Sequence, residues 1–248
     1  MAYAVVLGEA LVDLLETERD GELIYRQAIG GAPLNVAVGV TRLGGQVDYV
    51  GSLGTDTLGD RIAAFLADTG VGTGSTLRVP VPTTLAVTTF EGAEPTFQVY
   101  GEPPSYSLVS ADDVDQQRVA GAAVVYAGSI SLMREPFQSA ARAAWSVQGP
   151  VKVFDPNVRP KLLPDDAAVD ELRALVEGYF STADLVKLSS ADAEVLWPGA
   201  TPATAAERIL GLGAGAVVVT CGAQGAYVAT AAGSEQIPAP AVAAKSRR

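Results

Sequence analysis

Glycines and polar side chains suited to contacting a ligand are concentrated between residues 30 and 59, which read GGAPLNVAVGVTRLGGQVDYVGSLGTDTLG. Gly30 and Gly31 precede a short helical pattern, and Asn35 falls within its first turn. Bare backbone amides can approach a ligand closely, and an asparagine side chain both donates and accepts hydrogen bonds. This combination suits a ligand with many hydroxyl groups, although a tight turn before a core helix would use the same glycines.

Other polar residues follow short apolar runs. Asp13 comes after the run at 3–7, and three further groups occupy 155–160 (Asp-Pro-Asn-Val-Arg-Pro), 189–192 (Ser-Ser-Ala-Asp) and 220–225 (Thr-Cys-Gly-Ala-Gln-Gly). Ligands of open α/β sheets bind beyond the carboxyl ends of the strands. Each group alone is a weak signal, and Asp13 could be a surface charge on a loop. Together on one sheet edge, the groups would outline a cleft.

The composition excludes several kinds of chemistry. The chain has no histidine and one cysteine, which rules out Ser-His and Cys-His nucleophiles, ordinary zinc sites and an internal disulfide. A magnesium ion held by oxygen atoms stays possible. The 28 acidic against 17 basic residues disfavour nucleic acid and anionic membranes as partners. Because no apolar run could span a bilayer and acids interrupt the N-terminal run, we expect a cytoplasmic protein without a signal peptide.

The elements that would position these groups alternate between strand and helix. A helix should run between Pro33 and Gly44, and another should be capped by Asp56 and end at Gly70. Strands are expected at 3–7, 122–126, 151–154, 183–188, 217–220, 227–230 and 235–237, and helices at 135–147, 165–179, 190–197 and 202–212. Short Val-rich strands in this alternation favour a mostly parallel sheet covered on both faces.

Two stretches depart from the alternation. Residues 84–91 and 96–100 are rich in Thr, Val, Phe and Tyr, and a turn at 92–95 joins them without a helical crossover. This pattern predicts a β-hairpin, and residues 22–28 read similarly. A two-stranded ribbon is marginally stable alone, so the hairpin should pack against another part of the protein.

The stretch at 30–59 resembles the first signature of the ribokinase-like (PfkB) sugar kinases. The matching positions are Gly30, Gly31, Pro33, Asn35, Ala37, Gly44 and Gly54. The resemblance implies an α/β fold, a ribokinase-like mostly parallel sheet flanked by helices with a small β lid. It implies a single domain over 1–248, with lid strands at approximately 13–28 and 83–100. The lid would cover the sugar and could also form a homodimer interface.

The resemblance also implies roles for the polar groups. A small-molecule sugar would be bound by Asp13, Gly30, Gly31, Asn35, Tyr100, Asn157 and Arg159. ATP would be bound by Lys187, Ser189, Asp192, Thr220, Gly222 and Gly225, with Mg²⁺ held indirectly near Asp192. Three alternatives stay open: Arg159 could pair with a carboxylate, Asp192 could be a charge at a helix start, and the glycine loop could be a hairpin turn.

The sequence departs from the family pattern at two places. Tyr100 is followed by Gly101 and Glu102, where kinases of acidic sugars carry an arginine, so a neutral sugar such as fructose is expected. Residues 241–248 read Ala-Val-Ala-Ala-Lys-Ser-Arg-Arg, where the family has Gly-Ala-Gly-Asp. That segment supplies the catalytic base and anion hole. We therefore expect a C-terminally truncated, fructokinase-like phosphotransferase with very weak turnover. No catalytic residue is identified in it, although Arg159 could take part. The alternative is a non-catalytic relative that binds sugar or self-associates.

Overall fold

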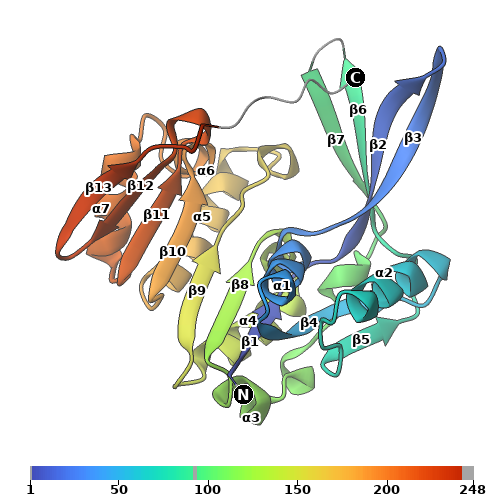
Figure 1. Cartoon of the computed structure of the whole chain (residues 1–248), viewed down its shortest axis with the longest axis horizontal. Helices are drawn as coiled ribbons and strands as arrows, with labels where there is room; N and C mark the ends of the chain where they lie inside the picture. The colour runs from blue at the N-terminus through green and yellow to red at the C-terminus, as the bar shows by residue number, and fades with distance from the viewer. Residues whose placement is uncertain (1, 92–93, 242–248) are drawn as a thin grey trace. The chain divides into compact units, whose positions relative to one another are not determined.

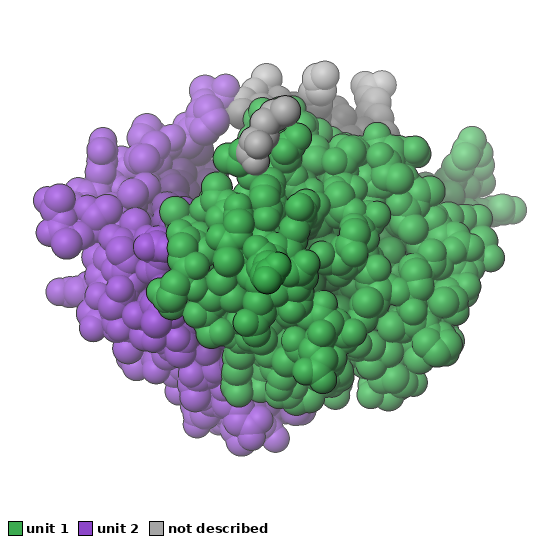
Figure 2. All heavy atoms as spheres, turned by 90° about the horizontal axis from the view of Figure 1, so that it is seen from below, with its two compact units in different colours: residues 1–152 green, residues 153–248 purple. Residues whose placement is uncertain are grey.

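The computed structural model describes residues 2–91 and 94–241. The chain forms two compact units, Met1–Lys152 (unit 1) and Val153–Arg248 (unit 2), which Figure 2 colours separately. Each unit contains strands and helices of an α/β fold. The boundary falls within one strand, so we describe the two units one after the other.

Unit 1 contains a parallel sheet with the strand order β8-β1-β4-β5 (Figure 1). The strands are β1 (Tyr3–Leu7), β4 (Gln46–Gly54), β5 (Thr76–Val79) and β8 (Val124–Gly128). Val5, Val6 and Leu7 are all buried, although they alternate between the two faces of the sheet. Burial of successive residues shows that the central strand is covered on both faces, as is usual for parallel sheets.

The helices of unit 1 begin and end where local chemistry predicts. They are α1 (Ala32–Arg42), α2 (Thr57–Asp68), α3 (Gln116–Ala120) and α4 (Phe137–Ser146), with short 3₁₀ turns η1 (Ser105–Ser107), η2 (Ala111–Asp113) and η3 (Ile130–Met133). Asp56 caps α2 by accepting a hydrogen bond from the Gly59 amide at 2.8 Å. Helix α1 starts at Ala32, one residue before Pro33, and packs on β1, β4 and β8.

A second, four-stranded sheet extends from unit 1, and we call it the small sheet (Figure 1). Its strands are β2 (Leu11–Arg19), β3 (Glu22–Gly30), β6 (Leu85–Glu91) and β7 (Glu94–Tyr100), in the order β3-β2-β6-β7. The interpretation of Asp13 as a loop residue is wrong, because Asp13 lies inside β2 between Ala28 and Ala86, at the start of the predicted lid strands. Of the predicted turn at 92–95, residues 92–93 lie outside the described residues, and β7 already includes the other two.

Unit 2 contains three parallel strands followed by an antiparallel hairpin. The strands are β9 (Val151–Asp155, beginning two residues before the boundary), β10 (Leu185–Ser189), β11 (Ala216–Thr220), β12 (Ala226–Thr230) and β13 (Gly233–Ile237). The helices are α5 (Asp166–Phe180), α6 (Ser190–Leu196) and α7 (Pro202–Leu212), with turns η4 (Pro160–Leu162) and η5 (Gly222–Gln224). The strands and α-helices were predicted from the sequence to within a few residues, whereas the turns η4 and η5 were not predicted as elements.

The sheet of unit 2 differs in one respect from the prediction of cover on both faces. Along β10 and β11, buried residues alternate with half-buried ones, so Val186 and Val217 are enclosed while Lys187 and Val218 are partly accessible. Helix α6 packs on β10, and α7 packs on β11 and β12. We call the half-buried side the open face. It carries Lys187, Ser189 and Thr220 near the carboxyl ends of the strands.

Candidate functional site

The first candidate cluster lies in unit 1, where the Asp13 carboxylate sits against the bare Cα of Gly30. A side chain on Gly30 would collide with Oδ2 of Asp13, so glycine is required for this close approach. Asp13 is half-buried in β2. A carboxylate held in this way offers hydrogen-bond acceptors to hydroxyl groups, which is the role that the resemblance implied for it.

Gly31 connects this carboxylate to helix α1. It is the N-cap residue, with φ of 120°, and a side chain there would collide with the carbonyl of Glu9. Its own carbonyl accepts the first helical hydrogen bond, from the Asn35 amide at 2.9 Å. The Asn35 side chain is exposed on the first turn. The structure therefore places the Asp13 carboxylate of β2 against the segment from Gly30 to Asn35 at the N-terminus of α1.

Tyr100 lies on the opposite face of the small sheet from Asp13. Asp13 pairs with Ala86, and Ala86 pairs with Val99, so Val99 shares the face of Asp13. Successive strand residues point to opposite faces, which places Tyr100 away from Asp13. Phe97 shares the face with Val99, so these two residues of β7, rather than Tyr100, lie on the same face of the small sheet as the carboxylate. Neither was among the residues predicted from the sequence.

A buried carboxylate that sequence reasoning missed lies beneath this segment. Glu9 is 2% exposed; its Oε1 accepts from the Ala32 amide at 3.1 Å and its Oε2 from Ser131 Oγ at 3.2 Å. Burial raises the pKa of Glu9 above its ordinary value, against the opposing effect of its hydrogen bonds. A Gly-Glu pair directly after a buried strand was the available signal, but the hydrogen-bond partners of Glu9 could not be identified from the sequence.

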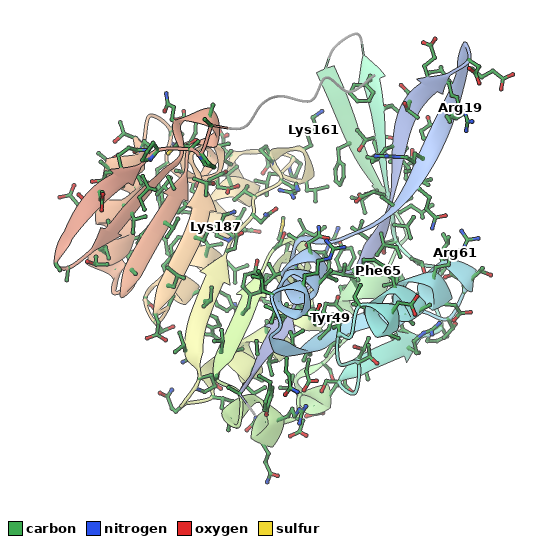
Figure 3. All side chains as sticks on the ribbon, in the orientation of Figure 1. Arg19, Tyr49, Arg61, Phe65, Lys161 and Lys187 are labelled. Atoms are coloured by element: carbon green, nitrogen blue, oxygen red, sulfur yellow. The ribbon has the colours of Figure 1, made fainter. Side chains whose placement is uncertain are left out.

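In unit 2, Lys187 forms an ion pair with Asp155. The Lys187 ammonium on β10 lies 2.9 Å from Oδ2 of Asp155, at the end of β9 (Figure 3). Burial raises the pKa of Asp155, and the positive charge of Lys187 acts in the opposite direction. The arrangement places one cation and one buried acid at the carboxyl ends of neighbouring strands.

The loop after β9 holds the other predicted residues of this region. Asn157 adopts a left-handed conformation, with φ of 41°. The exposed Arg159 guanidinium donates to the carbonyls of Asn157 at 3.3 Å and Val158 at 3.2 Å. These contacts hold Arg159 against its own loop and do not show the carboxylate partner that one interpretation predicted.

Ser189 and Asp192 form a capping box at the start of α6. Oδ2 of Asp192 accepts from the amide and the hydroxyl of Ser189, both at 2.7 Å, and Ser189 Oγ accepts from the Asp192 amide at 3.0 Å. Oδ1 of Asp192 accepts from the Val158 amide at 2.9 Å. Both carboxylate oxygens therefore have structural partners, as the helix-start interpretation of Asp192 requires. Among the described residues, no group of three or more acids or cysteines is arranged to hold a metal ion.

The glycine loop follows β11 and returns directly into β12. Thr220 pairs with Ser189 in the sheet register, and its hydroxyl donates to the Leu188 carbonyl at 3.4 Å. Gly222 and Gly225 have φ of 55° and 90°. The loop is thus a hairpin turn beside Ser189 at the edge of the open face, and its Gln224 and Gly225 amides donate to the carbonyls of Cys221 and Gly222. The predicted residues fall into two clusters, one in each unit.

Comparison with known proteins assigns the chain to a family. The pfkB family carbohydrate kinase model matches residues 1–246. Fructokinase-1 of Zea mays is 36% identical over 201 residues, which are 77% of this chain and 61% of that protein. The crystal structure of fructokinase from Xylella fastidiosa superposes with a TM-score of 0.85 at 30% identity, covering 97% of this chain and 76% of that one. A structure of fructokinase with bound ATP from the same organism gives 0.83 at 29% identity, covering 96% and 78%.

The chain spans about six tenths of the length of this plant relative (61%). No helix in the described part of the chain is long and apolar enough to cross a bilayer. The mostly parallel sheet with flanking helices agrees with the fold of these solved structures. The chain belongs to the pfkB family of carbohydrate kinases.

Proposed function

We propose that the protein is an ATP-dependent sugar kinase that transfers a phosphoryl group to a hydroxyl of fructose or a similar neutral sugar. The observation that carries this proposal is the Asp13 carboxylate held against Gly30 beside the N-terminus of α1. The membership of the chain in the pfkB family and its similarity to fructokinases support the same reaction. The Gly101-Glu102 pair after β7 supports a neutral sugar, because a glutamate would repel an acidic one.

In this proposal, Asp13 accepts hydrogen bonds from the sugar hydroxyls, and Asn35 both donates and accepts. Phe97 and Val99 supply apolar contacts on the same face of the small sheet. Bare amides at Gly30 and Gly31 add donors. Asn157 and Arg159 are kept as proposed sugar contacts, and Arg159 offers a positive charge for the transferred phosphate.

ATP is proposed to bind along the open face of unit 2, where the chemistry of the residues fits an anionic ligand. Lys187 supplies a positive charge, and the hydroxyls of Ser189 and Thr220 with the amides of Gly222 and Ala223 supply donors. The Gln224 and Gly225 amides donate within the turn. Bound Mg²⁺ would neutralise charge on the phosphates. Asp192 is proposed to contact the ion through water, which leaves its hydrogen bonds with Val158 and Ser189 in place, and Mg²⁺ usually keeps several waters.

A homodimer through the small sheet is also proposed, in the cytoplasm. Leu23, Tyr25 and Tyr100 lie on the face opposite Asp13 and are 72%, 50% and 51% exposed. Exposed apolar and aromatic side chains on one sheet face favour association. A Leu23→Glu variant should shift the protein to the monomer in sedimentation equilibrium, and an unchanged mass would contradict this interface.

Titration calorimetry with fructose tests the sugar site. Asp13→Ala should weaken binding about 10- to 100-fold, because hydrogen bonds to a charged group are lost. Glu18→Ala, on the same strand but exposed, is the matched control and should leave the affinity unchanged. Equal affinity of the Asp13→Ala variant and the wild type would refute the site.

A coupled assay with fructose, ATP and Mg²⁺ tests the reaction. The same assay tests the expectation of very weak turnover, which rests on residues 241–248. Residues 242–248 lie outside the described residues, so this expectation stays a prediction. Turnover with fructose supports the kinase. Fructose binding without turnover would favour a non-catalytic sugar-binding protein instead.

A further inference from the structure

Glu9 connects three segments of unit 1 that are distant in the sequence. It follows β1, its side chain reaches the first residue of α1 through the Ala32 amide, and it reaches the turn after β8 through Ser131. The Ser131 amide also approaches Oε2, at 3.5 Å. The preceding carbonyl, of Gly8, accepts a hydrogen bond of 2.6 Å from the buried Tyr49 hydroxyl (Figure 3). The carboxylate is therefore held from α1 and from the segment after β8, and the main chain just before Glu9 is held from β4.

Strained backbone supports the same carboxylate. Ser129, directly after β8, has φ of 140° and ψ of −128°, a backbone conformation that residues other than glycine rarely adopt. Ser129 is 4% exposed, and its side chain hydrogen-bonds to Glu9. Such strain persists only where the surroundings enforce it, and it is concentrated at functional sites.

Glu9 contacts the Gly30-Gly31 turn through its main chain as well as its side chain. Its carbonyl lies where a side chain on Gly31 would be, and its carboxylate holds the next amide, of Ala32. On the other side of the turn, Asp13 lies against Gly30. A shift of Glu9 would therefore move the turn relative to the Asp13 carboxylate.

We propose that Glu9 is a positioning residue for sugar binding, which holds the Gly30-Gly31 turn and the start of α1 in register with Asp13. This inference rests on the proposed sugar-kinase function. The two Glu9 oxygens both receive donors, from Ala32 on one side and Ser131 on the other. An ionised carboxylate accepts on both oxygens, whereas an amide would turn an NH₂ group toward a backbone amide, which cannot accept, of either Ala32 or Ser131.

The test compares fructose affinity with ATP affinity in variants that remain folded. Glu9→Gln should weaken fructose binding about tenfold or more, since small displacements in a binding site have large effects, and should leave ATP affinity unchanged. Glu9→Asp, which keeps two acceptor oxygens, should recover part of the loss. Ser52→Ala is the control, because Ser52 is fully buried and bonds to the Ser105 carbonyl at 2.7 Å, away from the turn. It should lower the melting temperature without changing fructose affinity.

Ser129→Gly provides a second variant if Glu9→Gln does not fold. Glycine relieves the positive φ, so the melting temperature should not fall by more than it does for Ser52→Ala, while fructose binding should still weaken. Fructose affinity within twofold of wild type in folded Glu9→Gln, or in Ser129→Gly if Glu9→Gln does not fold, would overturn the proposal.

Hydrogen exchange separates this inference from the proposed function. Glu9→Gln, or Ser129→Gly in its place, should accelerate exchange of the Ala32 amide, and Ser52→Ala should not. If the wild type binds neither fructose nor other sugars, the proposed function fails, but exchange at Ala32 still decides whether Glu9 fixes the turn. Unchanged exchange at Ala32 would show that it does not.

Discussion

Replacing Asp192 with alanine should destabilise the protein by about 2–4 kcal/mol. Asp192 is 6% exposed and accepts from Ser189 through one oxygen and from the Val158 amide through the other. Losing its part in the cap costs about 1 kcal/mol. The Val158 amide, left buried without its acceptor, adds about 1–3 kcal/mol.

Urea titration measures this change against a matched control. Asp165 caps α5 by accepting from the Ala168 amide at 2.9 Å, but it is exposed, so Asp165→Ala should cost only about 1 kcal/mol. In a chain of 248 residues, each kcal/mol lost from the free energy of unfolding should lower the melting temperature by about 2–4 °C, which makes the two variants separable. A loss of stability in Asp192→Ala no larger than in Asp165→Ala would refute the reasoning.

Asp192→Asn adds a second readout to the same experiment. An amide accepts through one oxygen only, so one of the two donor sets loses its partner and stability should fall by about 1–3 kcal/mol. If Asp192→Asn instead matched the wild type in stability and lost Mg²⁺-dependent ATP binding, the carboxylate would serve the metal rather than the fold.

Two further predictions concern unit 2. Gly225→Ala should destabilise the protein by more than the roughly 1–2 kcal/mol that a positive φ costs, because the added methyl group would collide with the Ile237 carbonyl. Gly222→Ala is the control, because its methyl group would meet open space among the described residues. Thermal unfolding compares the two variants, and equal losses of stability would contradict the turn geometry. Lys187→Met should raise the pKa of Asp155 further, since burial then acts without the opposing ammonium. An acid with a raised folded-state pKa adds no cost below its unfolded pKa of 3.8 and an increasing cost as pH rises through the folded value. The stability gap between Lys187→Met and wild type, measured by denaturant titration, should therefore be larger at pH 7 than near pH 4, and an equal gap would count against the ion pair.

Helix boundaries could be predicted because their signals are local. Asp56, Asp165 and Thr201 each accept a hydrogen bond from an amide three residues later, and such caps are visible as a residue type at a fixed spacing. Three strands of the small sheet, β3, β6 and β7, were likewise visible from their composition, whereas β2 was implied only by the resemblance. What the sequence could not supply was their pairing, which joins residues that are far apart in the chain.

The position of Tyr100 shows the consequence. Whether Tyr100 or Val99 faces Asp13 depends on two registers, of β2 with β6 and of β6 with β7, and a shift of one residue in either would exchange them. Glu9 was missed for a related reason. Its partners Ala32 and Ser131 lie 23 and 122 residues away, so nothing near Glu9 in the sequence reveals that the carboxylate is held on both oxygens.

The Ser189–Asp192 pair shows how one local motif can satisfy two interpretations. A capping box places a carboxylate at a helix N-terminus, and the same helix end is a favourable position for phosphate groups. The structural role does not exclude a functional one, but it restricts it. Oδ2 accepts twice from Ser189, so both of its acceptor sites are occupied, while Oδ1 accepts once, from the Val158 amide. Contact with Mg²⁺ through water, or an effect through the position of the α6 N-terminus, would leave all of these hydrogen bonds in place.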